Sequence, residues 1–308
     1  MTTGGSGPMP ADDGRPVPRA DFGPGPGIGK PPAPAPEPLP AVVFDSHCHL
    51  EMMDKSVSEV LLEADAAGVA RVITVGTDVP SARWAADCAA AFPDVYAAVA
   101  IHPNETAAAA RNQKEKDAVL AEIARLAALP QVLAVGETGL DYYRDSAPPE
   151  VQRDWFRAHI DVAKQVGKPL VIHDREAHED VLSILASDGP PEQVIFHCFS
   201  GDVELALRCA AAGYVISFAG TVTFQNASGL REAAAAIPPE LILAETDAPF
   251  LTPSPNRGRS NSPAQVANTV RALAEARQMD VAKLCAVIEA NGHRLFSGGS
   301  GDRPSGQS

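Results

Sequence analysis

Short runs of apolar, mostly β-branched residues alternate along the chain with longer segments whose apolar positions recur at helical spacing. Near-continuous hydrophobicity is typical of strands that are buried on both faces of a parallel sheet. The longer segments are rich in alanine and read as amphipathic helices. The predicted strands cover residues 41–44, 71–75, 95–101, 132–135, 170–172, 194–196, 214–218 and 241–244. The predicted helices cover residues 57–67, 82–91, 116–128, 151–166, 181–186, 203–212, 230–236 and 263–277.

This order of elements predicts one large barrel. Eight strand and helix units in succession over about 250 residues indicate an α/β protein of the (β/α)8 TIM-barrel class. A doubly wound sheet is the alternative, but no G-x-G-x-x-G motif opens a helix after an early strand. We therefore expect a single barrel domain over residues 41–297, with a last helix at 281–295 packed on its outside.

Both ends of the chain differ in composition from this domain. Proline and glycine dominate residues 1–40, which contain almost no aromatic or β-branched side chains. Because such a segment buries too little apolar surface to offset the entropy lost on ordering, it is expected to form a disordered extension. The Gly/Ser-rich residues 298–308 are expected to form a similar tail.

Composition narrows the class of protein. The chain has 308 residues and a formal net charge of −14, which argues against broad electrostatic binding of nucleic acid. It does not argue against a nucleic-acid enzyme, because bound cations supply local positive charge. Five scattered cysteines without a C-x-x-C pair are typical of a reducing compartment. No apolar run is long enough for a membrane span and no secretory signal is recognised, so we expect a cytoplasmic protein without a membrane partner. We also expect it to be a monomer.

Imidazoles and carboxylates stand where the predicted strands end, and TIM-barrel active sites form at that rim. His47 and His49 lie on one face of a strand by alternation, and this H-x-H spacing suits one metal ion. A lone histidine at a strand end is more often structural, and a carboxylate there can cap a helix. Recurrence at strand after strand favours a metal site. The residues concerned are His47, His49, His102, Glu137, His173, His197 and Asp247.

Longer motifs around these residues resemble those of the TatD family of metal-dependent deoxyribonucleases. The motifs are DSHCH at 45–49, GETGLDYY at 136–143, FHCFSG at 196–201, GTVTF at 220–224 and ETDAP at 245–249. The resemblance covers residues 41–297 and leaves out both tails. It implies a TIM-barrel hydrolase with two divalent metal ions (Mg²⁺, Mn²⁺ or Zn²⁺) that cleaves phosphodiesters, typically as a 3′-to-5′ exonuclease on DNA.

The resemblance also implies a role for each ligand-type residue. Glu137 matches the carboxylate that bridges both metals. The first metal would be held by His47, His49 and Asp247, and the second by His173 and His197. One departure is the segment His-Asp-Arg-Glu at 173–176, where the family often has His-Thr-Arg-Asp. It adds a carboxylate, Asp174, near the site and leaves the substrate contacts on this side open.

The expected reaction is hydrolysis by a water that two metals activate. Asp247 would accept the proton of this water, as a general base must lie within hydrogen-bond reach of it. His102 is expected to contact a phosphate rather than a metal, because six ligands already account for two ions. Arg257 and Arg259 are candidates for neutralising backbone phosphates, with a solvated loop as the alternative.

Supporting roles can be assigned by spacing. Asp45 or Glu245 could accept hydrogen bonds from the metal-binding histidines and so fix their tautomers. Tyr142, Tyr143 and Phe224 could stack on bases at a single-stranded DNA end, although aromatic side chains near a barrel rim often belong to the core.

Three other functions stay open at this point. An amidohydrolase-type deaminase or amide hydrolase also uses an H-x-H motif in a barrel, but it commonly bridges its metals with a carboxylated lysine where this chain has Glu137. Ester cleavage on aminoacyl-tRNA is a further alternative. A non-catalytic, metal-stabilised binding protein is less consistent with ligands that leave open coordination positions.

Overall fold

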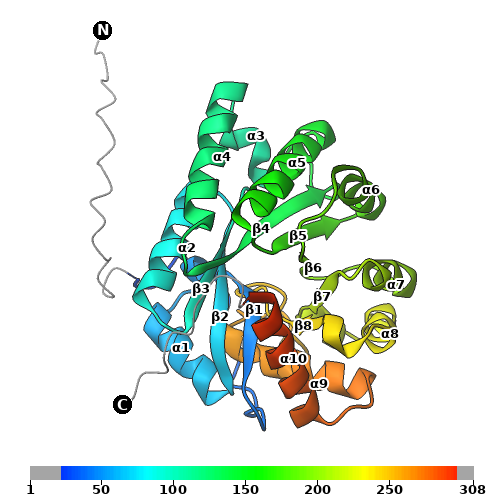
Figure 1. Cartoon of the computed structure of the whole chain (residues 1–308). Coiled ribbons are helices and arrows are strands. Elements are labelled where there is room, and N and C mark those ends of the chain that lie inside the picture. Colours follow the sequence, from blue (N-terminus) through cyan, green and yellow to red (C-terminus); the bar gives the residue numbers. More distant parts are fainter. Residues whose placement is uncertain (1–21, 297–308) are drawn as a thin grey trace.

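The computed structural model describes residues 22–296, which form eight parallel strands surrounded by helices (Figure 1). Each strand pairs with the next one in the sequence, so the spatial order is β1 to β8. The strands are β1 Val43–Cys48, β2 Val69–Gly76, β3 Val95–Val99, β4 Val132–Asp141, β5 Leu170–Arg175, β6 Val194–Phe196, β7 Val215–Phe218 and β8 Ile242–Ala244.

Backbone hydrogen bonds between the two ends of the sheet close it into a barrel. The amide of Asp247 donates to the carbonyl of His47 at 2.9 Å, and the amide of His49 donates to the carbonyl of Ala248 at 2.7 Å. Cys48 and Ala248 also form a parallel bridge. These bonds join β1 to the segment that follows β8, so the predicted (β/α)8 barrel is confirmed.

Helices begin where polar side chains satisfy the first free backbone amides. Asp78, Asn112 and Asp202 each accept a hydrogen bond from the amide three residues later, at the starts of α2, α4 and α7. The α-helices are α1 Val57–Ala66, α2 Val79–Ala91, α3 Thr106–Ala109, α4 Gln113–Ala127, α5 Pro149–Val166, α6 His178–Asp188, α7 Val203–Ala211, α8 Ser228–Ala236, α9 Val266–Ala276 and α10 Val281–Phe296. The 3₁₀ helices are η2 Leu50–Met52, η3 Pro103–Glu105, η4 Gly220–Thr223, η5 Pro239–Leu241 and η6 Pro263–Gln265.

Strand β4 is longer than its apolar pattern predicts. The prediction ends at residue 135, whereas the strand continues to Asp141 with every residue buried. The extra residues pair with β5, where Gly139 lies opposite His173. A Cβ atom on Gly139 would lie 2.1 Å from the carbonyl oxygen of His173, so a glycine is required there. Glu137 therefore projects from within a strand and not from the loop after it.

The last helix packs on the outside of the barrel, against β1 and β8 (Figure 1). Gly292 in α10 faces Phe44 of β1, and a Cβ atom on Gly292 would lie 2.1 Å from that ring. The absence of a side chain at residue 292 is what permits this close contact between helix and strand.

The expectation of a disordered extension over residues 1–40 is wrong for residues 22–40, which lie packed along the barrel. Phe22 is 3% exposed, and its ring packs edge-on against Trp84 and Phe92. Leu39 is buried near the other end of the segment. The segment cannot form a core alone, but the folded barrel supplies apolar surface and hydrogen-bond partners for it. The remaining tail predictions concern residues 1–21 and 298–308, which lie outside the described residues.

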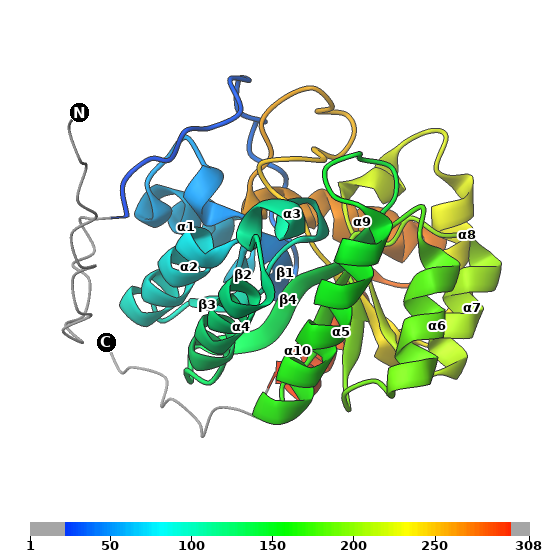
Figure 2. The ribbon, with the colours of Figure 1, turned by 90° about the horizontal axis from the view of Figure 1, so that it is seen from above.

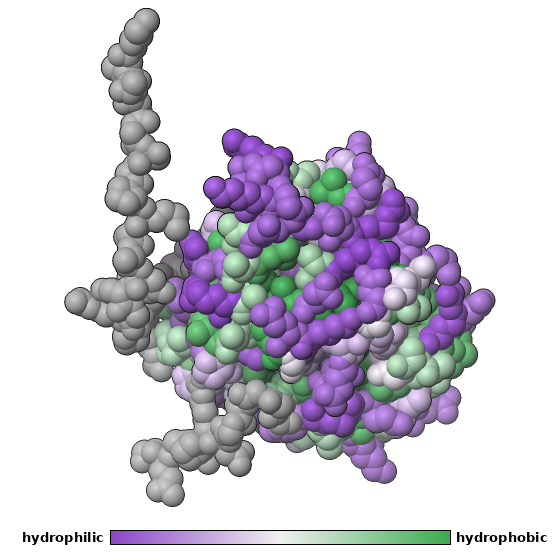
Figure 3. Space-filling view, turned by 45° about the horizontal axis from the view of Figure 1, so that its top comes forward, coloured by the Kyte–Doolittle hydropathy of each residue, from purple (hydrophilic) through white to green (hydrophobic). Residues whose placement is uncertain are grey.

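Hydrophilic side chains surround smaller hydrophobic areas on the face of the molecule shown in Figure 3. Isolated exposed apolar side chains are normal on a globular protein. Over residues 22–296, no helix combines the length and the apolar character that crossing a membrane requires. Within this described part of the chain, the large apolar side chains that remain exposed are Val42, Leu62, Tyr143, Leu207 and Phe250.

Candidate metal centre

The predicted ligands converge at the carboxyl end of the barrel. β1 carries His47 and is followed at once by His49, and the other ligands come from β4, β5 and the residues just after β6 and β8. Their ligand atoms form overlapping groups of three, each within 4.8 Å. The residues that the structure brings together are His47, His49, His102, Glu137, His173, His197 and Asp247.

The first half of the centre consists of His47, His49 and Asp247. The Oδ1 atom of Asp247 lies 3.3 Å from Nε2 of His49 and 3.8 Å from Nε2 of His47. The Oε1 atom of Glu137 is 3.5 Å from each of these two Nε2 atoms. Two imidazole nitrogens and two carboxylate oxygens thus face one small volume.

The second half consists of His173 and His197 around the other oxygen of Glu137. Its Oε2 atom lies 2.8 Å from Nε2 of His197 and 3.2 Å from Nδ1 of His173. One carboxylate therefore presents one oxygen to each half of the centre. This is the arrangement that a carboxylate shared by two cations needs.

The hydrogen bonding of His47 supports a bound cation. This side chain is completely buried, and neither Nδ1 nor Nε2 has a hydrogen-bond partner among the described residues. A buried polar atom without a partner is costly, and a metal ion that accepts the lone pair of Nε2 would remove that cost. Mixed imidazole and carboxylate donors suit Zn²⁺, Mn²⁺ or Mg²⁺. The residues present fit divalent metal ions.

Neighbouring acceptors fix which nitrogen of each histidine is free. Nδ1 of His49 bonds to the carbonyl of Val75 at 3.1 Å, and Nδ1 of His197 bonds to Glu245 Oε1 at 3.2 Å. When these nitrogens carry the proton, Nε2 keeps its lone pair for a cation. Glu245 thus takes the supporting position proposed for it by spacing.

Asp45 occupies a different position from the one that spacing suggested. Its carboxylate accepts hydrogen bonds from the amides of His47 and Thr246 and from the hydroxyl of Thr246. It is completely buried and ties the end of β1 to the segment after β8. Asp45 thus holds the backbone beside His47 and Asp247, and no imidazole is among the partners of its carboxylate in the described residues.

Asp141 supports His173, a role that the sequence analysis did not assign. Its Oδ2 atom accepts from Nε2 of His173 at 3.2 Å, which leaves Nδ1 of His173 free for a cation. Burial alone raises the pKa of Asp141, but hydrogen bonds from His173, Asn104 and the backbone of Arg144 lower it further than burial raises it. The sequence feature that could have identified Asp141 is its spacing from Glu137, because residues 137 and 141 share one face of β4 by alternation.

Replacing Asp141 by asparagine should weaken metal binding. The substitution removes the negative charge that holds the proton on Nε2 of His173, and losing such an outer partner costs about 10- to 100-fold in metal affinity. Calorimetric titration with Mn²⁺ measures the effect. Asp145→Asn, an exposed change of the same charge four residues on, is the matched control. Equal Mn²⁺ affinities of the two variants would contradict the role of Asp141.

His102 lies among the ligands, but it presents a hydrogen-bond donor to the centre and not a lone pair. Its Nδ1 accepts from the amide of Asn104 at 3.0 Å, so the neutral ring carries its proton on Nε2. Burial lowers the pKa of His102 to about 3, which keeps the ring neutral. This Nε2 lies 3.7 Å from Oε2 of Glu137 and can donate a hydrogen bond into the centre.

The ionisable side chains of the centre shift one another's pKa. Burial alone raises the pKa of Glu137, but the neighbouring imidazoles, His197 foremost, and a hydrogen bond from His173 hold it well below its usual range. Burial lowers the pKa of His197, yet Glu137 and Glu245 outweigh burial and raise it well above the ordinary value. A cation that binds His197 competes with this proton, so metal affinity falls as the pH falls.

Two arginines at the mouth of the barrel stack on aromatic rings. The guanidinium of Arg257 lies 3.9 Å from the ring centre of Phe224, and that of Arg175 lies 4.1 Å from the ring centre of Tyr143. Tyr142 instead donates its hydroxyl proton to Asp180 at 2.6 Å. Tyr143 and Phe224 thus each carry an arginine on one ring face, whereas Tyr142 is held by Asp180 of α6.

The extra carboxylate at residue 174 is turned away from the ligands. Oδ2 of Asp174 accepts from Nδ1 of His178, at the start of α6, at 2.7 Å. It follows His173 in β5, so alternation places the two side chains on opposite faces. Asp174 thus interacts with α6 and is not one of the grouped ligand atoms of the described residues.

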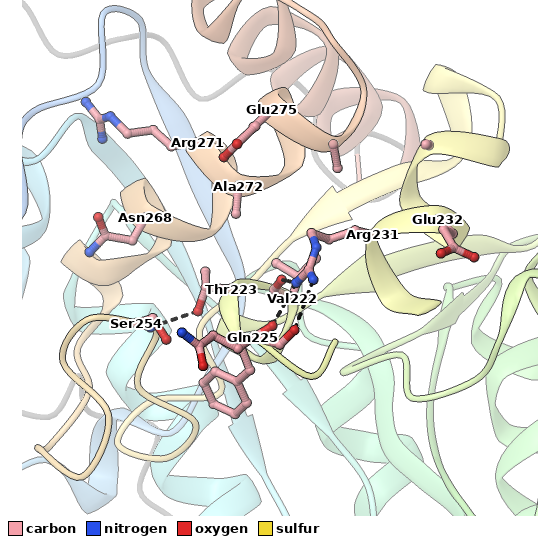
Figure 4. Close-up of a pocket in the computed structure, with 13 residues that line it drawn as sticks. Val222, Thr223, Gln225, Arg231, Glu232, Ser254, Asn268, Arg271, Ala272 and Glu275 are labelled. Carbon is pink, nitrogen blue, oxygen red and sulfur yellow. Dashed lines mark hydrogen bonds between the residues drawn. The ribbon is translucent and has the colours of Figure 1, made fainter. Parts of the chain in front are cut away.

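A cavity of about 690 Å³ lies between α8 and α9, next to η4 and the loop after β8 (Figure 4). Arg231, Arg271 and Phe224 are among the residues that line it. The guanidinium of Arg231 donates to the carbonyls of Val222 and Phe224, and that of Arg271 donates to the carbonyls of Glu37 and Pro38. None of the six predicted ligands lines this cavity. It is distinct from the metal centre but adjoins the Arg257 and Phe224 pair at the mouth.

Comparison with known proteins agrees with this geometry. A family model described as "TatD related DNase" matches residues 44–297. The chain is 44% identical over 261 residues to the uncharacterized metal-dependent hydrolase TatD of Mycobacterium tuberculosis, which covers 82% of this chain and 97% of that protein. It is 39% identical over 259 residues to the uncharacterized metal-dependent hydrolase YabD of Bacillus subtilis, which covers 83% of this chain and 99% of that protein.

A solved structure shows the same architecture. The crystal structure of YJJV, a TatD homolog from Escherichia coli, superposes with a TM-score of 0.74 at 30% sequence identity. The superposition covers 83% of this chain and 98% of that one.

Proposed function

The chain belongs to the TatD family of metal-dependent hydrolases, and from that premise we propose that it hydrolyses phosphodiester bonds of DNA from a 3′ end. The observation that supports this proposal best is the position of Glu137. Its two oxygens face two separate sets of imidazoles, at 3.5 Å from His47 and at 2.8 Å from His197. Such a carboxylate can hold two cations side by side, as in enzymes that transfer phosphoryl groups.

We assign Asp247 and His102 separate roles in this reaction, beside that of the cations. Divalent cations held here would neutralise charge on a phosphate and make water more acidic. Asp247 keeps 16% of its side chain exposed, so water can reach its carboxylate, and we assign it the task of accepting the proton. The Nε2–H group of His102 would donate to a phosphate oxygen and stabilise the charge that develops there.

The mouth supports a single-stranded nucleic-acid end as the substrate. Phe224 and Tyr143 offer ring faces on which bases can stack. Among the described residues, the stacked Arg257 forms no ion pair with a carboxylate, so its charge is available for a backbone phosphate despite the acidic chain. Arg259 instead donates to the carbonyl of Pro32.

The bridging position favours phosphoester over amide hydrolysis. Amidohydrolase-type enzymes commonly place a carboxylated lysine there, whereas β4 carries Glu137 and contains no lysine. The six-ligand arrangement also argues against a purely structural metal site, which would be closed to water.

One assay tests the proposal. Single-stranded DNA and RNA of the same sequence, labelled at the 5′ or the 3′ end, are incubated with the protein and Mg²⁺ or Mn²⁺. We expect stepwise shortening of 5′-labelled DNA and immediate release of the 3′ label as a mononucleotide. A chelator should stop the reaction, and added Mg²⁺ or Mn²⁺ should restore it.

The other outcomes point to other functions. Intact nucleic acid together with cleavage of an amide substrate would indicate an amidohydrolase. Intact nucleic acid together with deacylation of aminoacyl-tRNA would indicate an ester hydrolase of that kind. Cleavage that resists the chelator would rule out the proposed metal centre as the catalyst.

A further inference from the structure

Residues 22–40, here called the N-terminal strap, are an addition of this chain to the barrel. The family model begins at residue 44, after the strap has ended. The alignment to the Mycobacterium tuberculosis relative spans 97% of that protein but leaves out 18% of this chain. The alignment to the Bacillus subtilis relative spans 99% of that protein but leaves out 17% of this chain. The strap is nevertheless ordered, and it runs past the mouth of the barrel beside the loop that follows β8 (Figure 2).

After Phe22, the strap contacts the segment that follows His49. The amide of Gly25 donates to the carbonyl of Met53 at 2.6 Å, directly after η2. A Cβ atom on Gly25 would lie 1.9 Å from the carbonyl oxygen of Glu51, so the two backbones touch. Only a glycine permits this approach.

The strap next pairs with the long loop after β8. The amide of Ser260 donates to the carbonyl of Pro31 at 2.8 Å, and the amide of Ala33 donates to the carbonyl of Ser260 at 2.9 Å. Pro32 and Ser260 form a parallel bridge. Ser260 is followed by Asn261, whose side chain is hydrogen-bonded to residues beside the ligand Asp247.

Asn261 connects the paired residue to Asp247. Its side-chain amide donates to the carbonyl of Thr246 at 2.9 Å and to the carbonyl of Phe250 at 2.6 Å. Its own amide donates to the carbonyl of Pro249 at 3.0 Å. Asn261 thus holds the chain on both sides of Asp247. Because Asn261 directly follows Ser260, the strap that pairs with Ser260 also fixes the position of Asn261.

We infer that the N-terminal strap is a positioning element for the first half of the metal centre. It holds two loops in place, one that carries His49 and one that carries Asp247. Between β8 and η6 the chain forms no helix or strand, and such loops open readily unless they are tied down. Metal sites need their ligands held within about 0.5 Å. The inference depends on the metal centre and not on the substrate proposed above.

A matched pair of glycine variants tests it. Gly25→Ala places a methyl group against Glu51 and should lift the strap away from η2. Gly23→Ala, two residues earlier, has nothing within 4 Å of the new methyl group and is the control. In Mn²⁺ titrations by calorimetry, Gly25→Ala should weaken binding of one ion by about tenfold or more and leave the other unchanged. Gly23→Ala should bind both ions as the unaltered protein does.

A double-mutant cycle separates positioning from general stabilisation. In a protein that carries Asp247→Asn, the first half already lacks a ligand, so adding Gly25→Ala should change Mn²⁺ binding no further. A loosened barrel would instead lower binding of both ions in either background. Because these titrations use Mn²⁺ without nucleic acid, they stay informative if the nuclease assay fails.

A pair of deletions extends the test. Removing residues 1–40 should reproduce the loss of one ion, whereas removing residues 1–21 should not, and thermal unfolding reports the stability of both proteins. If the protein without the strap binds two Mn²⁺ ions with unchanged affinity, or if Gly25→Ala merely lowers the unfolding temperature, the inference is overturned.

Discussion

Glu137→Gln should lower phosphodiester hydrolysis by about a thousand-fold or more while the barrel stays folded. Glutamine has nearly the same shape, but it offers one acceptor oxygen and an NH₂ group that donates hydrogen bonds. Glutamine therefore has an acceptor oxygen for only one of the two cations, and the calorimetric signal for both Mn²⁺ ions should weaken. The rate is measured with a simple aryl phosphodiester, which does not depend on the choice of nucleic acid.

The control for this variant is Glu105→Gln. Glu105 is exposed in η3, at the same mouth, and the substitution removes the same charge. Its rate should remain that of the unaltered protein. Turnover of Glu137→Gln within about tenfold of normal, with both ions bound, would show that Glu137 does not bridge them.

Asp247→Asn should lower the rate by about 10²- to 10⁴-fold, the range expected when a positioned base is lost. Asp247 has a φ of 55°, a left-handed conformation that asparagine tolerates well, so the backbone should keep its path. The second half of the centre keeps Glu137, His173 and His197. One Mn²⁺ ion should therefore still bind with near-normal affinity, which distinguishes this variant from Glu137→Gln.

The outcome is read from two measurements together. Asp145→Asn, exposed in the loop after β4, carries the same charge change and should bind two ions and turn over normally. If Asp247→Asn loses both ions, the halves of the centre are not separable as the distances suggest. If it keeps both ions and the full rate, Asp247 is neither ligand nor base.

The barrel could be predicted because its signals are local. A strand buried on both faces must be apolar along its length, and a helix outside it must be apolar on one side, so both patterns appear in the sequence. The same reasoning stops at residue 135 in β4, because GETGLD contains two glycines and two acidic residues. Pairing with β5 and full burial make that segment a strand, and neither is visible in its own composition.

The metal ligands could be predicted from the sequence, whereas the hydrogen-bond acceptors that orient the histidines could not. The six ligand-type residues follow apolar runs, so each could be found one at a time. The acceptor for each histidine could not, because it depends on which side chains meet across the barrel. Asp141 meets His173 and Glu245 meets His197 through distances that only the closed sheet sets.

The order of apolar and polar residues is enough to predict the barrel, the rim that carries the polar side chains and the residue types that point to a metal. It does not predict that one oxygen of Glu137 faces each half of the centre, that His102 presents an N–H group, or that residues 22–40 lie against the barrel. This is because periodicity and composition reflect only what each segment buries by itself. Tautomers, shared ligands and a glycine in contact with a distant carbonyl depend on atoms that the chain brings together only when it folds.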